Sequence, residues 1–402
     1  MKQRLILPNP HSGQVKFLNS KAKRKVLMCG RRWGKSLICK SLAIQGALDK
    51  KLIAYVTPTF SLGKVFYKEL LETIGSELIE ECNQTDLYIK LITGGSIRFF
   101  TGEAPDNFRG HKFHLAILDE CAYIKSLKNF FFECINPCLT DFNGDAIFLS
   151  TPRGQGDFFQ FYNYGLSSEL KYKNWESFHY STYDNPHLKR EVIEEAKREL
   201  PEMVFAQEYL AIPQVSGANC FGNHIAKNII PTLSRKKDKA IGIDLASTVD
   251  WSVVIGLSDE NGVATMSRLQ RWQSDWNDTK MKLKELPRSI DKMMDNSGVG
   301  KPIFDELKLE LSNLYGFNFN VASKPILIKE LILAVEQGKI RYCQSVADEM
   351  LNFEYKYSDL NPKNIKYEAV SGHDDQVIAL ALCWHMYNKR TRRSNTYSFR
   401  RA

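Results

Sequence analysis

The segment at positions 26–37 constrains the fold of this chain more than any other. An apolar run at 26–28 leads into a loop at 29–36 with the sequence Cys-Gly-Arg-Arg-Trp-Gly-Lys-Ser, and a second apolar stretch begins at Leu37. This order predicts a strand, a tight glycine turn and the start of a helix. In that layout the backbone N–H groups and the helix dipole face a bound phosphate. We therefore expect a phosphate-binding loop at one edge of an α/β sheet.

The residue types in this loop suit a nucleoside triphosphate with its magnesium ion. Lys35 would neutralise the β- and γ-phosphates, and the Ser36 hydroxyl would hold Mg²⁺. The usual pattern opens with glycine, whereas this loop opens with Cys29, whose side chain is small enough for a tight turn. The alternative is a chance Gly-Lys-Ser triplet.

A pair of acidic residues further along the chain supports the interpretation of this loop as a nucleotide site. The apolar run at 113–118 ends in Asp119 and Glu120, as a buried parallel strand does when it delivers its last residues to the edge where nucleotides bind. Asp119 would help to hold Mg²⁺, and Glu120 would orient and deprotonate the attacking water. A glutamate at that point favours hydrolysis over phosphoryl transfer to a substrate hydroxyl. The alternative is a strand that ends in two acids by chance.

Composition sets broad limits. A chain of 402 residues is long enough for two or three domains, and its net charge of +9 points weakly to a polyanionic partner. The nine cysteines are scattered without Cys-x-x-Cys spacing, which favours free thiols in a reducing compartment over zinc binding. No secretion leader is apparent, and the apolar run at 377–384 is too short to span a bilayer. We expect a cytosolic protein with no membrane partner.

The pattern of apolar runs predicts two α/β halves. Strands are expected at 25–28, 52–56, 96–100, 115–118 and 146–149, followed by a helical pattern at 190–209. Breaks near Pro213, Gly217 and Gly222 mark a linker. A second sheet is expected from strands at 240–244, 252–257 and 264–271, with a helix at 374–387. The domains would be 1–215, with a lid at about 155–215, then a linker at 216–239, a second domain at 240–388 and a mobile basic tail at 389–402.

Four other residues of the first half are candidates for the same site. Gln14 has an amide that matches an adenine edge, although an upstream glutamine is usually a surface residue. Ser150 and Thr151 follow a predicted strand and offer two hydroxyls that would sense the γ-phosphate, or they form a simple turn. Arg109 lies in a polar loop, where an arginine is a solvated charge or a finger that neutralises the transition state.

Acidic residues recur in the second half. Asp244 ends a predicted strand, Asp250 follows on the next turn, Asp295 precedes a glycine-containing turn, and Asp374 and Asp375 open an apolar helix. Acids from separate elements that converge would suit a two-metal nuclease using Mg²⁺ or Mn²⁺. Each acid also has an ordinary explanation, as a helix N-cap or a turn residue. Spacing alone does not establish that they converge.

Taken together, these motifs resemble the large terminase subunit of tailed double-stranded-DNA bacteriophages over nearly the whole chain. The resemblance lies in the loop at 30–36, Tyr-Val-Thr-Pro-Thr at 55–59, Asn-Phe-Arg-Gly at 107–110, Leu-Asp-Glu at 118–120 and Ser-Thr-Pro at 150–152. It continues through Asp-Asn-Pro at 184–186, Gln-Glu-Tyr at 207–209 and the acidic motifs at 242–244, 295–300 and 372–375. One departure is that Lys292, Met293 and Met294 stand before Asp295, where the family has a clean apolar strand.

The resemblance implies a RecA-like P-loop ATPase domain with a helical lid, followed by an RNase H-like α/β nuclease domain. Glu120 would be the catalytic carboxylate, and Arg109 would act in trans on a neighbouring subunit. Ser150 and Thr151 would couple hydrolysis to movement, and Asp244, Asp250, Asp295, Asp374 and Asp375 would supply the nuclease metal ligands. The residues implied to bind Mg-ATP are Gln14, Gly30, Arg31, Arg32, Gly34, Lys35, Ser36 and Asp119.

The function implied is a motor that hydrolyses ATP to move duplex DNA into a procapsid and cuts concatemeric DNA. Its partners would be double-stranded DNA, the portal protein and the small terminase subunit, with a homo-oligomeric ring on the portal and a monomer in solution. It would act in the host cytoplasm, transiently at the procapsid portal. The main alternative is an ATP-dependent translocase or helicase whose second domain is not catalytic. A P-loop kinase for a small metabolite is a third class, disfavoured by Glu120.

Overall fold

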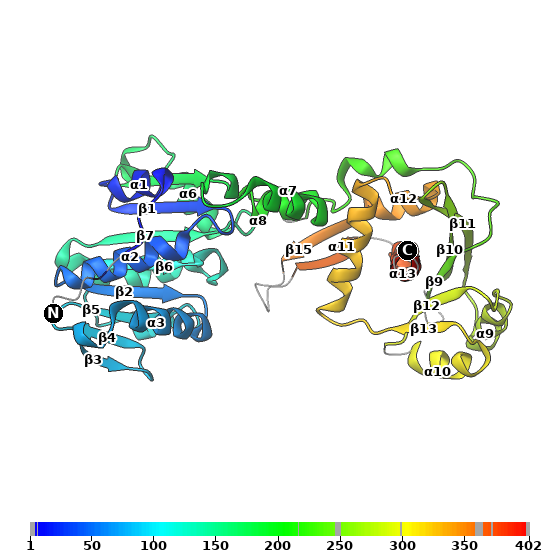
Figure 1. Cartoon of the computed structure of the whole chain (residues 1–402), viewed down its shortest axis with the longest axis horizontal. Coiled ribbons are helices and arrows are strands. Elements are labelled where there is room, and N and C mark those ends of the chain that lie inside the picture. The colour runs from blue at the N-terminus through cyan, green and yellow to red at the C-terminus, as the bar shows by residue number, and fades with distance from the viewer. Residues whose placement is uncertain are drawn as a thin grey trace. The chain divides into compact units, whose positions relative to one another are not determined.

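The computed structural model describes residue 5 and residues 7–215, 217–245, 251–297, 300–357, 365–370 and 373–398. The chain divides into two compact units, which we describe separately (Figure 1). The first comprises Met1–Arg198 and Met203–Val215, and the second comprises Glu199–Glu202 and Ser216–Ala402. Within the described ranges, no helix combines the length and the apolar character needed to cross a membrane.

An eight-stranded sheet organises the first unit, in the order β3-β4-β5-β2-β6-β7-β1-β8. Strands β5, β2, β6, β7, β1 and β8 run parallel to one another. The hairpin of β3 and β4 adds an antiparallel edge beside β5. The bounds are β1 Arg24–Cys29, β2 Leu52–Thr57, β3 Ile79–Asn83, β4 Tyr88–Leu91, β5 Ser96–Thr101, β6 Leu115–Asp119, β7 Asp145–Ser150 and β8 Trp175–Tyr180.

Helices cover both faces of this sheet because its strands are apolar on both sides. Leu27 and Cys29 of β1 belong to the core shared with α2 and α3, whereas Val26 and Met28 belong to the core shared with α6 and the segment 130–138. The helices of this half are α1 Ser12–Asn19, α2 Lys35–Leu48, α3 Phe60–Ile74, α4 Leu127–Asn129, α5 Asn136–Cys138, α6 Asp157–Tyr164, α7 Arg190–Glu199 and α8 Glu202–Glu208.

Three expectations for the first unit need correction. The helical pattern at 190–209 is two helices, since Pro201 lacks the N–H that a continuous helix requires. The strands β3, β4 and β8 were not expected, because β3 is largely exposed and β4 and β8 lack a continuous buried run. Strand β8 lies inside the segment assigned to a lid, yet it pairs with β1 in the main sheet.

The second unit contains a six-stranded mixed sheet in the order β13-β12-β9-β10-β11-β14. Strand β10 is antiparallel to both β9 and β11, whereas β12 is parallel to β9 and β13. The bounds are β9 Ala240–Asp244, β10 Ser252–Glu260, β11 Val263–Trp272, β12 Asp291–Asp295, β13 Leu314–Phe317, β14 Ile340–Arg341 and the hairpin β15 Phe353–Tyr357 and β16 Ile365–Ala369. The helices are α9 Trp276–Lys284, α10 Gly300–Glu310, α11 Ser323–Glu336, α12 Gln344–Leu351 and α13 Asp375–Ser398.

The segment before Asp295 forms strand β12 although it contains a lysine. Lys292 is completely buried in this strand, and its ammonium group donates to the carbonyl oxygens of Pro287 at 2.6 Å and Ile290 at 2.7 Å. Backbone carbonyls therefore satisfy the charged head while the aliphatic stem stays in the core. The segment is a strand in spite of its lysine, and Asp295 is its last residue rather than a turn residue.

The predicted linker and tail also differ from expectation. Residues 217–239 belong to the second unit, where Cys220 N donates to Phe353 O and Ile230 N donates to Tyr342 O. Phe221 is buried there as well. Helix α13 continues past Tyr387 to Ser398, into the segment assigned to a tail, and residues 399–402 lie outside the described part of the chain.

Candidate functional sites

The phosphate loop lies between β1 and α2, as the sequence predicts. Strand β1 ends at Cys29, and α2 begins at Lys35. Gly34 caps the helix with a φ of 111°, a conformation open to glycine but not to residues with a Cβ atom. The loop therefore turns directly into the helix, and its first-turn N–H groups are left to meet a phosphate.

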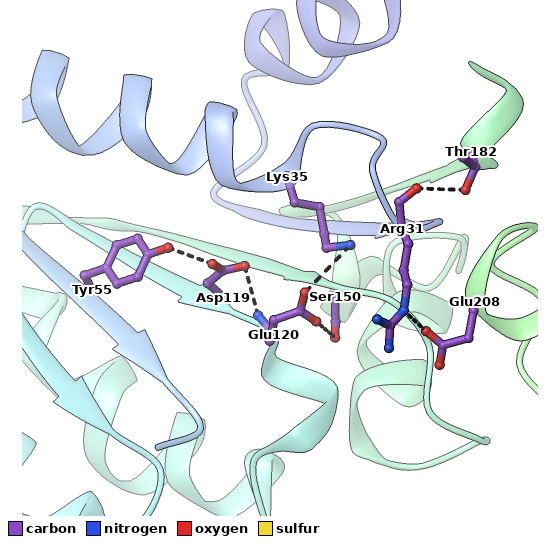
Figure 2. Close-up of polar contacts among 8 residues, drawn as sticks. All are labelled: Arg31, Lys35, Tyr55, Asp119, Glu120, Ser150, Thr182 and Glu208. Carbon is purple, nitrogen blue, oxygen red and sulfur yellow. Dashed lines mark hydrogen bonds and ion pairs between the residues drawn. The ribbon is translucent and has the colours of Figure 1, made fainter. Parts of the chain in front are cut away.

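The acids at the end of β6 lie beside this loop (Figure 2). Lys35 Nζ is 3.8 Å from Glu120 Oε1, and Ser150 Oγ donates to Glu120 Oε2 at 3.2 Å. The sheet order explains this convergence, because β7 lies between β1 and β6 and brings Ser150 between the two motifs. Glu120 also has a φ of 49°, a costly conformation for a glutamate that is typical of functional sites.

Asp119 is held by two hydrogen bonds. The Tyr55 hydroxyl donates to Oδ2 at 2.8 Å, and the Glu120 backbone N–H donates to Oδ1 at 3.0 Å. Burial, and then the charge of Glu120, raise the pKa of Asp119 to about 6. A cation beside the two acids would relieve that repulsion, so an oxygen-ligated Mg²⁺ suits this pair.

Residues from the later part of the unit hold the phosphate loop from its other side. Arg31 pairs with the Glu208 carboxylate, and its backbone N–H donates to Glu208 O at 2.7 Å (Figure 2). Thr182 Oγ1 donates to Arg31 O at 2.8 Å, and Asn185 Nδ2 donates to Arg32 O at 2.7 Å. Sequence reasoning did not name Thr182 or Glu208 as site residues. Both are far from the loop along the chain, and only the tertiary structure brings them to it.

Gln14 reaches the phosphate loop through its amide. Its Nε2 donates to Gly34 O at 3.2 Å, and its Oε1 accepts from His11 N at 3.0 Å. A cavity of about 330 Å³ adjoins this glutamine and the first turns of α2. Its lining is mainly apolar and consists of Leu7, Pro8, Asn9, Pro10, Gln14, Leu18, Leu37, Ile38, Ser41, Leu42 and Gln45.

Arg109 and Thr151 complete the predicted residues of this half. Arg109 follows the short 3-10 helix Pro105–Phe108, and its side chain is 61% exposed. Within the described ranges its ion-pair partner is Asp106, at 2.9 Å, rather than a residue of the phosphate loop. Thr151 is buried directly after β7.

In the second unit, strand order brings the predicted acids together. Asp244 ends β9 and Asp295 ends the neighbouring parallel strand β12, in which Met294 pairs with Ile243. Helix α13 crosses β9 closely at Gly242, where an added Cβ would lie 2.0 Å from Ala379 O. This close packing brings Asp375, the first residue of α13, to the same end of the sheet.

The charges of these acids act on one another. Burial, and then the charges of Asp375, Asp374 and Asp295, raise the pKa of Asp244 well above its ordinary value. Asp295 Oδ1 accepts hydrogen bonds from Ser297 N and Ser297 Oγ, at 2.8 and 2.5 Å. Asp250 lies outside the described residues. Among those described, no three His, Cys, Asp or Glu side chains are close enough, as they stand, to hold a metal ion.

Lys324 is a cation at this acidic cluster that sequence reasoning did not name. Its Nζ is 3.4 Å from Asp374 Oδ2, and its charge partly offsets the rise in the pKa of Asp244. The other members of this acidic cluster are carboxylates, which repel one another. Such oxygen donors fit Mg²⁺ or Mn²⁺, either of which would relieve the repulsion. A lone lysine well separated from every acidic motif carries no signal in the sequence.

The fold and the two sites define a class of protein. The first unit has the fold of a P-loop nucleotide hydrolase. Its parallel sheet carries a phosphate loop and an Asp-Glu pair, with a serine between them. The mixed sheet of the second unit, with strand β10 antiparallel and acids at the ends of β9, β12 and α13, has the architecture of an RNase H-like nuclease. The predicted fold class is thereby confirmed.

Comparison with known proteins identifies the family. The family model described as the N-terminal part of the T4likevirus-type terminase large subunit matches residues 26–225. The terminase large subunit of Thermus phage G20c is 26% identical and aligns over 94% of this chain and 87% of its own length. That of Escherichia phage T5 is also 26% identical, over 89% of this chain and 86% of its own length. The chain belongs to the large terminase subunits of bacteriophages, which are ATP-hydrolysing and DNA-cleaving enzymes of genome packaging.

A solved structure shares the fold over both units. This large terminase, from a thermophilic bacteriophage, is 16% identical and covers 94% of this chain and 98% of its own, with a TM-score of 0.54. At this identity the likeness concerns the fold alone.

Proposed function

We propose that the first unit hydrolyses ATP with Lys35, Ser36, Asp119 and Glu120. The observation that carries this is the set of contacts at Glu120, whose carboxylate lies between Lys35 Nζ and Ser150 Oγ. Lys35 binds the phosphates, Ser36 and Asp119 are suited to hold Mg²⁺, and Glu120 takes the proton of the attacking water. The large terminase of the thermophilic bacteriophage, which shares this fold, has been solved with ADP and with ATP-γ-S, which supports a nucleotide at this site.

The cavity beside Gln14 is the proposed adenosine site. Its lining is apolar, and Gln14 keeps one Nε2 hydrogen and one Oε1 lone pair beyond its hydrogen bonds to Gly34 and His11. An adenine accepts the first at N7 and donates to the second from its amino group. Gln14 would thereby join base recognition to the position of the phosphate loop.

We further propose that the acids of the second unit cut duplex DNA with two divalent ions. Asp244, Asp295, Asp374 and Asp375 would hold the ions, with Asp250 a further candidate. Two such ions activate a water molecule and stabilise the leaving oxygen of the scissile phosphate. The support is that Asp244 and Asp295 end the neighbouring parallel strands β9 and β12, with Asp375 at the start of the helix packed on β9.

The assembled state is also part of the proposal. The exposed Arg109 has no phosphate-loop partner within the described residues of its own chain, which suits a finger that acts on the next subunit of a ring. Such a ring would form on the portal protein of a procapsid in the host cytoplasm, with DNA supplied through the small terminase subunit. Backbone phosphates would dominate DNA binding, so affinity would fall steeply with salt.

The decisive experiment assays both activities in the purified chain. Plasmid cleavage with Mn²⁺ and without ATP should vanish in Asp244→Ala and persist in the matched control Asp278→Ala, a partly exposed aspartate that pairs with Lys282. ATP hydrolysis should vanish in Lys35→Ala, whose plasmid cleavage should remain close to that of the wild type. If the wild type cuts nothing, the second unit is a binding module and the chain is a translocase with a non-catalytic second half. Equal loss of both activities in Lys35→Ala would contradict two independent sites.

A further inference from the structure

Tyr55 of β2 makes direct contact with the acid proposed to hold Mg²⁺. Strands β2 and β6 run parallel, with Tyr55 opposite Ile117, two residues before Asp119. Residues two apart on a strand project to the same face, so Tyr55 and Asp119 share the face covered by α2. The Tyr55 hydroxyl donates to Asp119 Oδ2 at 2.8 Å (Figure 2).

Packing holds the ring of Tyr55 in place. The side chain is completely buried, with its ring stacked on Phe66 of α3 at 4.2 Å between centroids and tilted against Phe99 of β5 at 5.2 Å. A ring enclosed in this way has no room for another rotamer, so the hydroxyl position is determined by the core. A buried tyrosine hydroxyl also requires a polar partner, and the Asp119 carboxylate supplies it.

The Tyr55 hydroxyl also lies close to α2, the helix that follows the phosphate loop. The Cys39 thiol of α2 lies beside this hydroxyl. Cys39 lies three residues after Ser36, about one turn along the same helix. Tyr55 therefore stands between the helix that carries Lys35 and Ser36 and the strand that carries Asp119.

These contacts leave Asp119 with one orientation. Oδ2 accepts from Tyr55 and Oδ1 accepts from the Glu120 N–H, so rotation of the carboxylate would break both hydrogen bonds. Each oxygen keeps a lone pair for a cation or for a water molecule bound to it. Orientation of a ligand by a hydrogen bond from a residue behind it is a general determinant of metal affinity.

We propose that Tyr55 is a positioning residue for the magnesium nucleotide, acting through the orientation of Asp119. The proposal rests on the assignment of Asp119 to Mg²⁺ made above. It adds that the tyrosine contributes to binding only when the ion is present, since its hydroxyl acts on the proposed ion ligand and not on the phosphates.

The test compares the affinity of the full-length chain for a fluorescent ADP derivative in Mg²⁺ and in EDTA. Tyr55→Phe keeps the ring and removes the hydroxyl, so affinity in Mg²⁺ should fall about tenfold, as for loss of a hydrogen bond to a charged group. Affinity in EDTA should stay the same, and the Mg²⁺ concentration for half-maximal ATP hydrolysis should rise. The control is Tyr67→Phe, a buried tyrosine of the same core cluster that packs on Phe99 at 5.7 Å. It should change neither affinity.

Three outcomes would overturn the proposal. Equal losses in Mg²⁺ and EDTA would show that Tyr55 acts only as a structural residue. Unchanged Mg²⁺ affinity in Tyr55→Phe, beside a loss in Asp119→Asn, would leave the proposed site intact and remove Tyr55 from it. Unchanged Mg²⁺ affinity in Asp119→Asn itself would refute the assignment of Asp119, and the role of Tyr55 with it.

Discussion

Ser150 Oγ donates a hydrogen bond to Glu120 Oε2 across 3.2 Å, from the end of one strand to the end of its neighbour. The other carboxylate oxygen of Glu120 lies 3.8 Å from Lys35 Nζ. The glutamate that we assign to water activation is thus held between a hydroxyl and an ammonium group, and either contact can change when phosphate binds or leaves.

We expect Ser150→Ala to slow ATP hydrolysis without weakening ATP binding. Loss of the hydroxyl frees Glu120 to leave the orientation needed for proton transfer, so kcat should fall about 10- to 100-fold, less than on removal of the base itself. Steady-state kinetics with a nucleotide affinity measurement would check this. Ser258→Ala is a suitable control, since Ser258 is also fully buried and donates to Thr265 O in the second unit. A rise in KM with unchanged kcat would instead assign Ser150 to binding.

The raised pKa of Asp244 predicts an unusual effect on stability. Because its pKa is higher in the folded than in the unfolded chain, Asp244 favours folding below the ordinary aspartate pKa of about 4 and loses that contribution as pH rises. Asp244→Asn should therefore stabilise the metal-free protein at pH 8 and have little effect near pH 4. Thermal unfolding in EDTA across this range would measure it. A variant less stable than the wild type at pH 8 would contradict the repulsion inferred from the four acids.

Lys324 should compete with divalent ions for the acidic cluster. Its ammonium group lies 3.4 Å from Asp374 Oδ2, and both side chains are about one-third exposed, so the pair is worth at most about 1 kcal/mol. Lys324→Ala should tighten Mn²⁺ binding in the absence of DNA by about twofold to fivefold, as titration with electron paramagnetic resonance would detect. Lys280→Ala removes a similar ion pair, with Glu306, and should not change Mn²⁺ affinity. Weaker binding in Lys324→Ala would mean that the lysine supports the metal site.

Arg109 should affect the rate of ATP hydrolysis only in the assembled motor. If it reaches the nucleotide of a neighbouring subunit, Arg109→Ala should lower the ATPase rate of the assembled protein by about 10³-fold or more and leave the basal rate of the isolated chain unchanged. Lys112→Ala, which removes an exposed cation paired with Asp141, is the matched control. The same fractional loss in the isolated chain and in the assembly would exclude a role in trans.

Much of the first unit follows from local sequence. Strands β1, β2, β5, β6 and β7 were predicted within a residue or two at each end, because a strand buried on both faces is a continuous apolar run that any window detects. The largely exposed strand β3 and the partly buried strand β8 carry no such run. Strand β12 was missed for a different reason, since the charge of Lys292 hides a strand whose carbonyl partners are visible only in the folded chain.

The candidate sites divide in the same way. Asp119 and Asp244 are recognisable from sequence because each ends an apolar strand, and parallel strands deliver their last residues to one edge. Lys35 is recognisable because it follows the glycine loop after such a strand. Tyr55 and Glu208 lie in motifs that the sequence shows, but their contacts with Asp119 and Arg31 are visible only in the tertiary structure. Lys324 has no sequence signal, and only the fold brings it to Asp374. The residues of a motif lie close together in the sequence and can therefore be recognised there. The groups that orient their side chains come from distant elements. Their positions depend on sheet order and helix packing, which residue spacing does not encode.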